Sequence, residues 1–265
     1  AADNFFQKTD PGYFQHQSDR LATSPTASSR GFEWESVVPT NLEGIFHGRI
    51  VSNALFNGNE PPHEMFRRRA EIIGCKGAMQ TTTHADKIGD ETMTMDQFLD
   101  SHINKDSEFN GFPVPPFYFP YAQWSGPDIA FVVRFIGNTP DEEDIKCVVF
   151  AQLKLRGDID SSDAEDARKS VQPKKINNHG IKLSEYCKPH KHYISLVLAY
   201  PAEIAQYFSS KPPLMGHGKD ITEIALTIDT NNIRQLFAKE YVDELELLKR
   251  FGEEMEHDLE IARKR

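Results

Sequence analysis

Two segments that read as β-strands contain residues whose types and spacing could do chemistry. The first, residues 126–133, has Asp128 near its start, and the second, residues 148–155, has Gln152 and Lys154 near its end. Alternate side chains of a strand share one face, so pairing of the segments would bring these three residues together. Carboxylate and amide oxygens suit a hard cation such as Mg²⁺. Because a neighbouring lysine can position a water and stabilise charge on a phosphate, the pattern indicates metal-dependent phosphodiester chemistry.

The same pattern also has a purely structural interpretation. Strands often end in polar residues where they reach the surface, and an aspartate after a proline is a common turn element. On either interpretation, the alternation predicts that Val148 and Phe150 share a face with Gln152 and Lys154. The residues expected on the opposite face are Val149, Ala151, Leu153 and Leu155.

Hydrophobic periodicity predicts the elements that must position these residues. Upstream, the pattern predicts a helix that starts near Phe32 and continues past Pro39 to Phe46. The proline-rich run 112–121 is expected to be a buried loop that covers the sheet, because proline is excluded from central strands. Four further helices are expected: over 64–73, from Thr94 to Ile103, over 163–172 with Ser161 or Ser162 as its cap, and from Asn231 or Asn232 onward. Two further strands are expected, over 193–200 and 221–228. The predicted class is α/β, with a central mixed β-sheet flanked by helices.

Composition sets the broad class of the chain. Its 265 residues are 38% hydrophobic and 26% charged, which suits a globular protein with a sizeable core. No run approaches the ~20 apolar residues that cross a bilayer, so no membrane partner is expected. The first residues contain neither a basic region nor an apolar core, so no signal peptide is visible. We therefore expect an intracellular protein, with the nucleus as one option.

The charge distribution bears on a nucleic-acid partner. A net charge of −10 argues against such a partner, but residues 168–192 contain seven lysines and arginines against the single acid Glu185. This basic stretch would allow one surface to contact phosphates. The residues expected to make those contacts are Arg168, Lys169, Lys174, Lys175 and Lys182. The alternative is an ordinary solvated helix and loop.

These motifs together resemble the PD-(D/E)xK nuclease superfamily. In that core an acidic helix precedes a strand with Asp and a strand with Glu-x-Lys, and Pro127-Asp128 and Gln152-Leu153-Lys154 match the two strand motifs. Gln replaces the usual acid, as in the branch that resembles Mrr-type restriction enzymes, and Phe32-Glu33, with Glu35 two residues on, matches the helix motif of that branch. The arrangement is more loosely similar to nuclease-like domains of Crinkler-type effectors. The resemblance covers about residues 31–40 and 126–230.

The resemblance implies a restriction-endonuclease-like core and a set of site residues. Mg²⁺ or Mn²⁺ would be held by Asp128, the amide oxygen of Gln152, the carbonyl oxygen of Leu153 and either Glu33 or Glu35. Lys154 would position the attacking water. Many such nucleases cut both strands as dimers, which makes a homodimer an option.

The expected organisation is a flexible tail over 1–30 and a single domain over 31–265, with a helical and loop insertion at about 58–125. The expected function is metal-dependent hydrolysis of phosphodiester bonds in DNA, with RNA less favoured. Little sequence specificity is expected, since phosphate contacts do not read bases. The alternatives are a nuclease-like module that binds nucleic acid without cutting it and an effector-type interaction domain. The interaction domain would use the acidic C-terminal helix or the run 112–121.

Overall fold

A mixed β-sheet connects the parts of the chain that could do chemistry. The computed structural model describes residues 27–56, 60–74, 87–88, 91–120, 126–172, 175–176, 183–187, 192–208, 222–235, 249–250, 254, 257 and 260–261. Within these residues the main sheet has seven strands in the order β1-β2-β8-β9-β10-β11, with β7 also paired to β8. Their bounds are β1 Arg49–Ile50, β2 Arg69–Ile72, β7 Phe117–Tyr118, β8 Ile129–Phe135, β9 Ile145–Arg156, β10 His192–Pro201 and β11 Thr222–Ile228.

The two segments predicted to pair are neighbours in this sheet. β8 and β9 are antiparallel, with Ile129 opposite Ala151 and Phe135 opposite Ile145. β10 then pairs in parallel with both β9 and β11. A parallel pair needs a crossover connection, and helix α6 (Ser161–Ser170) lies in the connection from β9 to β10. The strands predicted over 193–200 and 221–228 are therefore confirmed.

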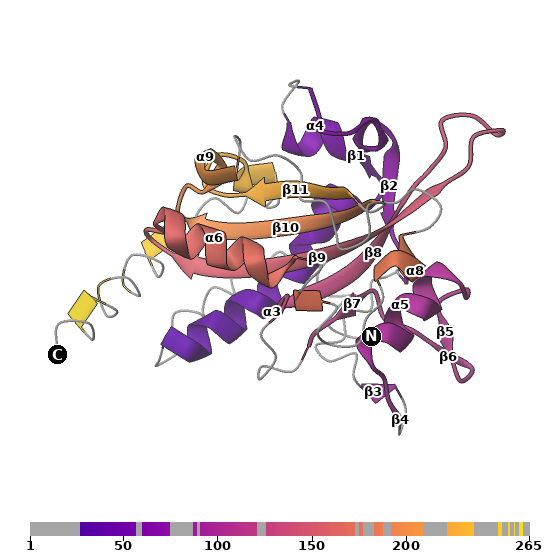
Figure 1. Cartoon of the computed structure of the whole chain (residues 1–265), viewed down its shortest axis with the longest axis horizontal. Helices are drawn as coiled ribbons and strands as arrows, with labels where there is room; N and C mark the ends of the chain where they lie inside the picture. Colours follow the sequence, from indigo (N-terminus) through magenta and orange to yellow (C-terminus); the bar gives the residue numbers. More distant parts are fainter. Residues whose placement is uncertain are drawn as a thin grey trace, which may run out of the picture.

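Helices cover both faces of the sheet. On one face lies α3 (Ala27–Phe46), whose Trp34, Val38, Leu42 and Ile45 are buried at helical spacing. These side chains pack with the β8 and β9 residues that include Phe131. On the other face lie α5 (Met95–Ile103), α6 and α8 (Leu183–Tyr186), packed against residues that include Val132 and Phe150. Figure 1 shows α6 and α3 on opposite sides of the strands.

The remaining described elements are short. They are α4 Val51–Leu55, η1 Glu64–Arg67, β3 Lys87–Ile88, β4 Glu91–Thr92, β5 Glu108–Phe109, β6 Phe112–Pro113, α9 Ala205–Phe208 and η2 Ile233–Gln235. No described helix combines the length and the apolar character needed to cross a bilayer.

Several predicted elements differ in detail. Residues 64–73 form η1 and then strand β2, because Ala70 and Ile72 are buried with alternating rather than helical spacing. The run 112–121 differs from the expected buried loop: residues 112–113 form the exposed strand β6, residues 117–118 form β7 within the buried stretch 114–118, and residue 121 lies outside the described part. β2 and β7 come from the segment 58–125, so part of that segment belongs to the sheet.

The helix ends also depart from the expected positions. The first turn of α3 begins at Ala27, inside the predicted tail, and residues 1–26 lie outside the described part. The side chain of Asp160, rather than Ser161 or Ser162, caps α6 and accepts hydrogen bonds from the backbone N–H groups of Ser162 and Asp163, both at 2.8 Å. The predicted C-terminal helix begins near a 3₁₀ turn, η2, and residues 236–248 also lie outside the described part.

Candidate functional site

Asp128 lies immediately before β8, at the point where β9 extends past its partner. Its backbone N–H donates to the carbonyl of Ala151 at 2.8 Å. Its carboxylate Oδ2 accepts a hydrogen bond from the backbone N–H of Leu153 at 2.7 Å and another from the Gln152 side-chain Nε2. The structure therefore brings Asp128 and the Gln152-Leu153-Lys154 motif together, as the strand alternation predicts.

The Leu153 carbonyl lies on the same edge of β9. In an antiparallel ladder the N–H and C=O groups of one residue point to the same neighbouring strand. The Leu153 N–H points to Asp128, so its carbonyl oxygen faces the same side, beyond the first residue of β8. Its side chain is buried in the opposite core, with α3. Leu153 can thus offer a backbone oxygen beside the Asp128 carboxylate.

Lys154 lies on the same face of β9 as Gln152 and is half-buried. It makes no hydrogen bond or ion pair with another residue in the described ranges. Burial raises the pKa of Asp128, while the Leu153 N–H, the Lys154 charge and the Gln152 amide oppose that increase. Lys154 is therefore a nearby cation whose ammonium can meet an incoming anion.

Glu35 brings a second carboxyl group from α3. Burial and the charge of Asp128 raise its pKa to about 7, and the charge of Lys154 acts against them. Glu35 therefore lies within electrostatic range of both residues. Its neighbour Trp34 anchors this part of the helix, with its ring stacked on Tyr200 at a centroid distance of 6.4 Å. The side chain of Glu33 lies outside the described residues.

The far end of the Gln152 amide contacts α6. Ser170 Oγ donates to Gln152 Oε1, and it also lies 2.6 Å from the carbonyl of Ala167. The amide therefore presents its nitrogen to Asp128 and its oxygen to α6. This orientation differs from the one expected for an oxygen ligand. The strand motif alone could not identify Ser170, because its position depends on how α6 packs against β9.

A pocket of about 220 Å³ opens beside these residues, between β9 and α6. Its residues are Gln152, Lys154, Arg156, Ile159, Asp163, Asp166, Ala167 and Ser170. The strand residues alternate along one face of β9, and the helix residues recur at the spacing of one helical face. The pocket therefore extends from the candidate site along the end of β9.

The oxygen groups fit a hard divalent cation better than a transition metal. Asp128, the Leu153 carbonyl and Glu35 could supply oxygen atoms, whereas the Gln152 oxygen faces Ser170 on α6. Mg²⁺ uses few protein ligands and keeps several waters. The described residues contain no group of three or more His, Cys, Asp and Glu side chains placed to hold a metal. Two carboxyl groups and one neutral carbonyl oxygen would therefore give a site of low charge.

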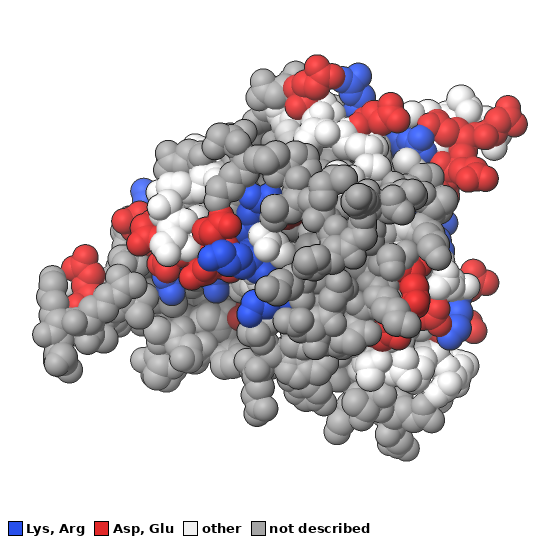
Figure 2. Space-filling view, viewed as in Figure 1, with Lys and Arg blue, Asp and Glu red and all other residues white. Residues whose placement is uncertain are grey.

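The described cations of the predicted basic stretch do not form a uniform basic surface. Arg168 is 3% exposed and pairs with buried Glu223, with 3.2 Å between Nη2 and Oε2, so its charge is neutralised in the interior. Lys169 is exposed but pairs with Asp166 at 2.8 Å, and Lys175 is half-buried. Figure 2 shows both signs of charge side by side over α6. The other two predicted contacts, Lys174 and Lys182, lie outside the described residues.

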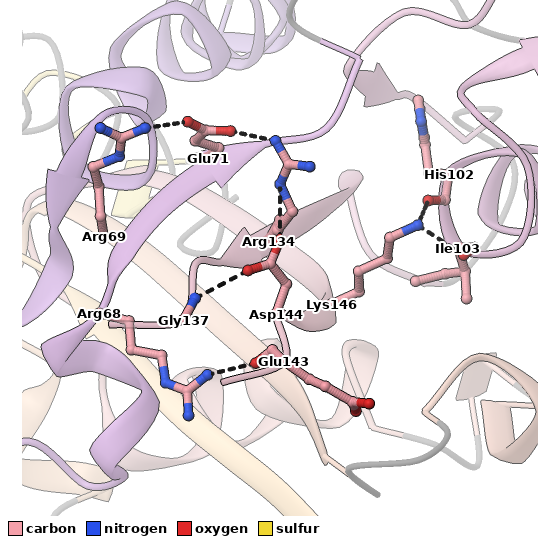
Figure 3. Close-up of polar contacts among 10 residues, drawn as sticks. All are labelled: Arg68, Arg69, Glu71, His102, Ile103, Arg134, Gly137, Glu143, Asp144 and Lys146. Carbon is pink, nitrogen blue, oxygen red and sulfur yellow. Dashed lines mark hydrogen bonds and ion pairs between the residues drawn. The ribbon is translucent and has the colours of Figure 1, made fainter. Parts of the chain in front are cut away.

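A second pocket, of about 310 Å³, lies at the other end of β8 and β9. Figure 3 shows two of its cations with their partners: Arg134 donates to Glu71 at 2.5 Å, and Lys146 donates to the carbonyls of His102 and Ile103. Burial lowers the pKa of His102 to about 4, so this ring is neutral near pH 7. These contacts favour a structural network at this end of the sheet.

Comparisons of the chain with protein-family models, with curated proteins and with solved structures find no match. The functional assignment therefore depends on the residues of the site.

Proposed function

We propose that the protein is a metal-dependent nuclease that hydrolyses phosphodiester bonds in DNA, with RNA less favoured and with little sequence specificity. The observation that carries this proposal is the junction of β8 and β9. There the Asp128 carboxylate accepts hydrogen bonds from the Leu153 N–H and the Gln152 amide. Lys154 lies beside them and has no hydrogen-bond or ion-pair partner among the described residues. Acid, neutral oxygens and lysine at one strand end are the groups that metal-assisted phosphoryl chemistry uses.

Each residue has a definite role in this proposal. Asp128, Glu35 and the Leu153 carbonyl would hold Mg²⁺ or Mn²⁺, and the Gln152 oxygen would join them once the amide turns over. The ion would supply Lewis-acid stabilisation of the phosphate and a more acidic water. Lys154 would stabilise the charge that develops on the phosphate oxygens.

The order of elements supports the same proposal. α3 precedes the antiparallel strands β8 and β9, α6 follows, and β10 and β11 are parallel to β9. This is the order expected from the resemblance to the PD-(D/E)xK superfamily, with its restriction-endonuclease-like core.

The test is cleavage of plasmid DNA and of labelled oligonucleotides in Mg²⁺ or Mn²⁺, with EDTA as the metal-free control. We expect Asp128→Ala and Lys154→Ala each to lower the cleavage rate by about 100-fold or more, since single groups at such sites contribute on that scale. Lys105→Ala is the matched control, because Lys105 is exposed and pairs with Asp100 away from the site. Cleavage that survives both site substitutions would show that other residues do the chemistry.

One observation favours a second candidate, a nuclease-like module that binds nucleic acid without cutting it. Gln152 contributes no charge and presents its nitrogen to Asp128, and lower ligand charge weakens divalent binding. This candidate predicts salt-dependent binding of DNA without cleavage in either metal. The same oligonucleotides, measured by mobility shift and by cleavage, separate the two functions.

A further inference from the structure

The pocket between β9 and α6 places two cations in line along one strand face. Lys154 and Arg156 are two residues apart on β9 and both line the pocket. At ~3.3 Å of rise per residue their Cα atoms are separated by roughly 6.6 Å along the strand. Neighbouring phosphates of one nucleic-acid strand lie at a similar spacing, because a single sugar separates them. The strand face therefore offers one cation for each of two successive phosphates.

We propose that this pocket is the subsite for a single nucleic-acid strand, in which Arg156 binds the phosphate next to the one at Lys154. This inference rests on the proposed function and adds to it the strandedness of the substrate. Arg156 is a substrate-binding residue in this proposal, because it contacts the substrate backbone next to the reacting phosphate.

The opposite wall of the pocket explains why one strand fits better than two. α6 contributes two acids to the pocket lining: Asp163, which pairs with Arg156, and Asp166, which pairs with Lys169. Duplex DNA carries one charge per ~1.7 Å of its axis and holds its second backbone at a fixed distance from the first. A single strand can bend its backbone into the pocket and turn its bases away from these carboxylates. The volume of about 220 Å³ is also small for a ligand pocket, which limits it to a short piece of backbone.

The ion pair between Arg156 and Asp163 holds the arginine ready for a phosphate. Their atoms Nη1 and Oδ2 are 2.8 Å apart, and the two side chains are 29% and 40% exposed. Ion pairs with this exposure are weak. A phosphate can therefore replace Asp163 as the partner of the Arg156 guanidinium group. That group suits bidentate contacts with phosphate oxygens. The two partners then predict opposite effects: removal of Arg156 weakens binding of the strand, and neutralisation of Asp163 strengthens it.

The experiment measures KM and kcat of the full chain in Mg²⁺ for a labelled oligodeoxynucleotide, as a single strand and as the matching duplex. We expect a lower KM for the single strand. Arg156→Gln should raise that KM about 10-fold with little change in kcat, as expected for the loss of one charge-assisted phosphate contact. Asp163→Asn should lower it. Arg67→Gln is the control, because Arg67 is exposed and pairs with Glu60 in a different part of the chain.

The outcomes separate this inference from the proposed function. Cleavage of the duplex with equal or better KM, or equal KM values for Arg156→Gln and Arg67→Gln, would overturn the subsite while leaving the nuclease intact. If the parent cuts neither substrate, the nuclease proposal fails. The subsite is then judged by fluorescence anisotropy with the labelled single strand. Equal Kd values for Arg156→Gln and Arg67→Gln in this binding assay would overturn the subsite. Thermal unfolding checks that each variant is folded.

Discussion

The side chain of Gln152 lies between Asp128, which accepts a hydrogen bond from its nitrogen, and Ser170, which donates one to its oxygen. Ser170 Oγ has one hydrogen but contacts two acceptors, Gln152 Oε1 and the carbonyl of Ala167. If the amide turns over, Ser170 can accept from its nitrogen and donate to Ala167. The amide oxygen then faces Asp128, where a bound cation would separate the two oxygen atoms. Ser170 is therefore placed to hold Gln152 as a ligand.

Substitution of Ser170 tests this role. Ser170→Ala should weaken Mn²⁺ binding by about 10-fold, the lower end of the effect of outer-shell partners on metal affinity. Ser170→Thr keeps the hydroxyl and should restore most of the affinity. Isothermal titration with Mn²⁺ measures both. Parent-like affinity in Ser170→Ala would mean that Gln152 needs no partner on α6.

The raised pKa of Glu35 predicts how stability depends on pH without metal. The folded protein holds the Glu35 proton up to about pH 7, whereas the unfolded chain releases it near 4.5. The folded state therefore binds more protons between these values, and the free energy of unfolding falls as pH rises through that window. Glu35→Gln removes this pH-dependent loss of stability, because a glutamine side chain does not ionise. In EDTA at pH 8 the variant should melt a few degrees above the parent, since ~1 kcal/mol corresponds to about 2–4 °C for a chain of this size class.

The pH series provides the control for this prediction. At pH 5 the Glu35 carboxyl is protonated in the folded parent, so the melting temperatures of parent and Glu35→Gln should approach each other. A constant difference between pH 5 and pH 8 would place its origin in packing rather than in ionisation.

For individual residues, the sequence predicts contacts that follow from strand alternation but not contacts that depend on how distant elements pack. The meeting of Asp128 with Gln152 follows from alternation within two strands. The choice of Glu35 depends on the angle at which α3 crosses the sheet, and the burial of Arg168 depends on Glu223, 55 residues further along the chain. No local pattern contains either relation.

The elements around the site differ in how well their sequences specify them. β8, β9 and β10 contain long apolar runs buried on both faces, which strongly favour central strands. β2 has four residues, and its two charged side chains suit a helix surface equally well. Its identity as a strand is decided by pairing with β8, where Ala70 lies opposite Phe135. Short elements are thus set by tertiary contacts more than by their own sequence.

Helix α6 contributes to both the candidate site, through Ser170, and the pocket beside β9. Its N-terminus is capped by Asp160, which accepts two backbone hydrogen bonds. Asp160→Ala should cost about 1 kcal/mol of stability, a typical value for a lost N-cap. Because α6 carries Ser170, the variant should also weaken Mn²⁺ binding. Asp158→Ala is the matched control, since Asp158 is exposed and lies before the cap. Equal melting temperatures for the two variants would contradict the role of the cap.

The whole molecule is acidic, and its charges are unevenly distributed. The loop between β8 and β9 contains Asp141, Glu142, Glu143 and Asp144, and acidic side chains project at this end of the molecule in Figure 2. Near the proposed site, cations and acids alternate instead. A net charge of −10 gives no long-range attraction for a polyanion. Among the described residues, the cations available to a nucleic acid near the candidate site are therefore few, and their contacts would be short-range.

This distribution predicts a shallow dependence of binding on salt. Each phosphate contact to a single strand contributes about −0.7 to the slope of log K against log salt. If Lys154, Arg156 and one further cation bind phosphates, the slope should be about −2. Fluorescence anisotropy across a series of salt concentrations measures it, in Ca²⁺ if Mg²⁺ permits cleavage. Lys154→Ala should make the slope shallower by about one contact, whereas Lys105→Ala should leave it unchanged. A parent slope several times steeper would mean that a broad basic surface, rather than the strand end of β9, holds the nucleic acid.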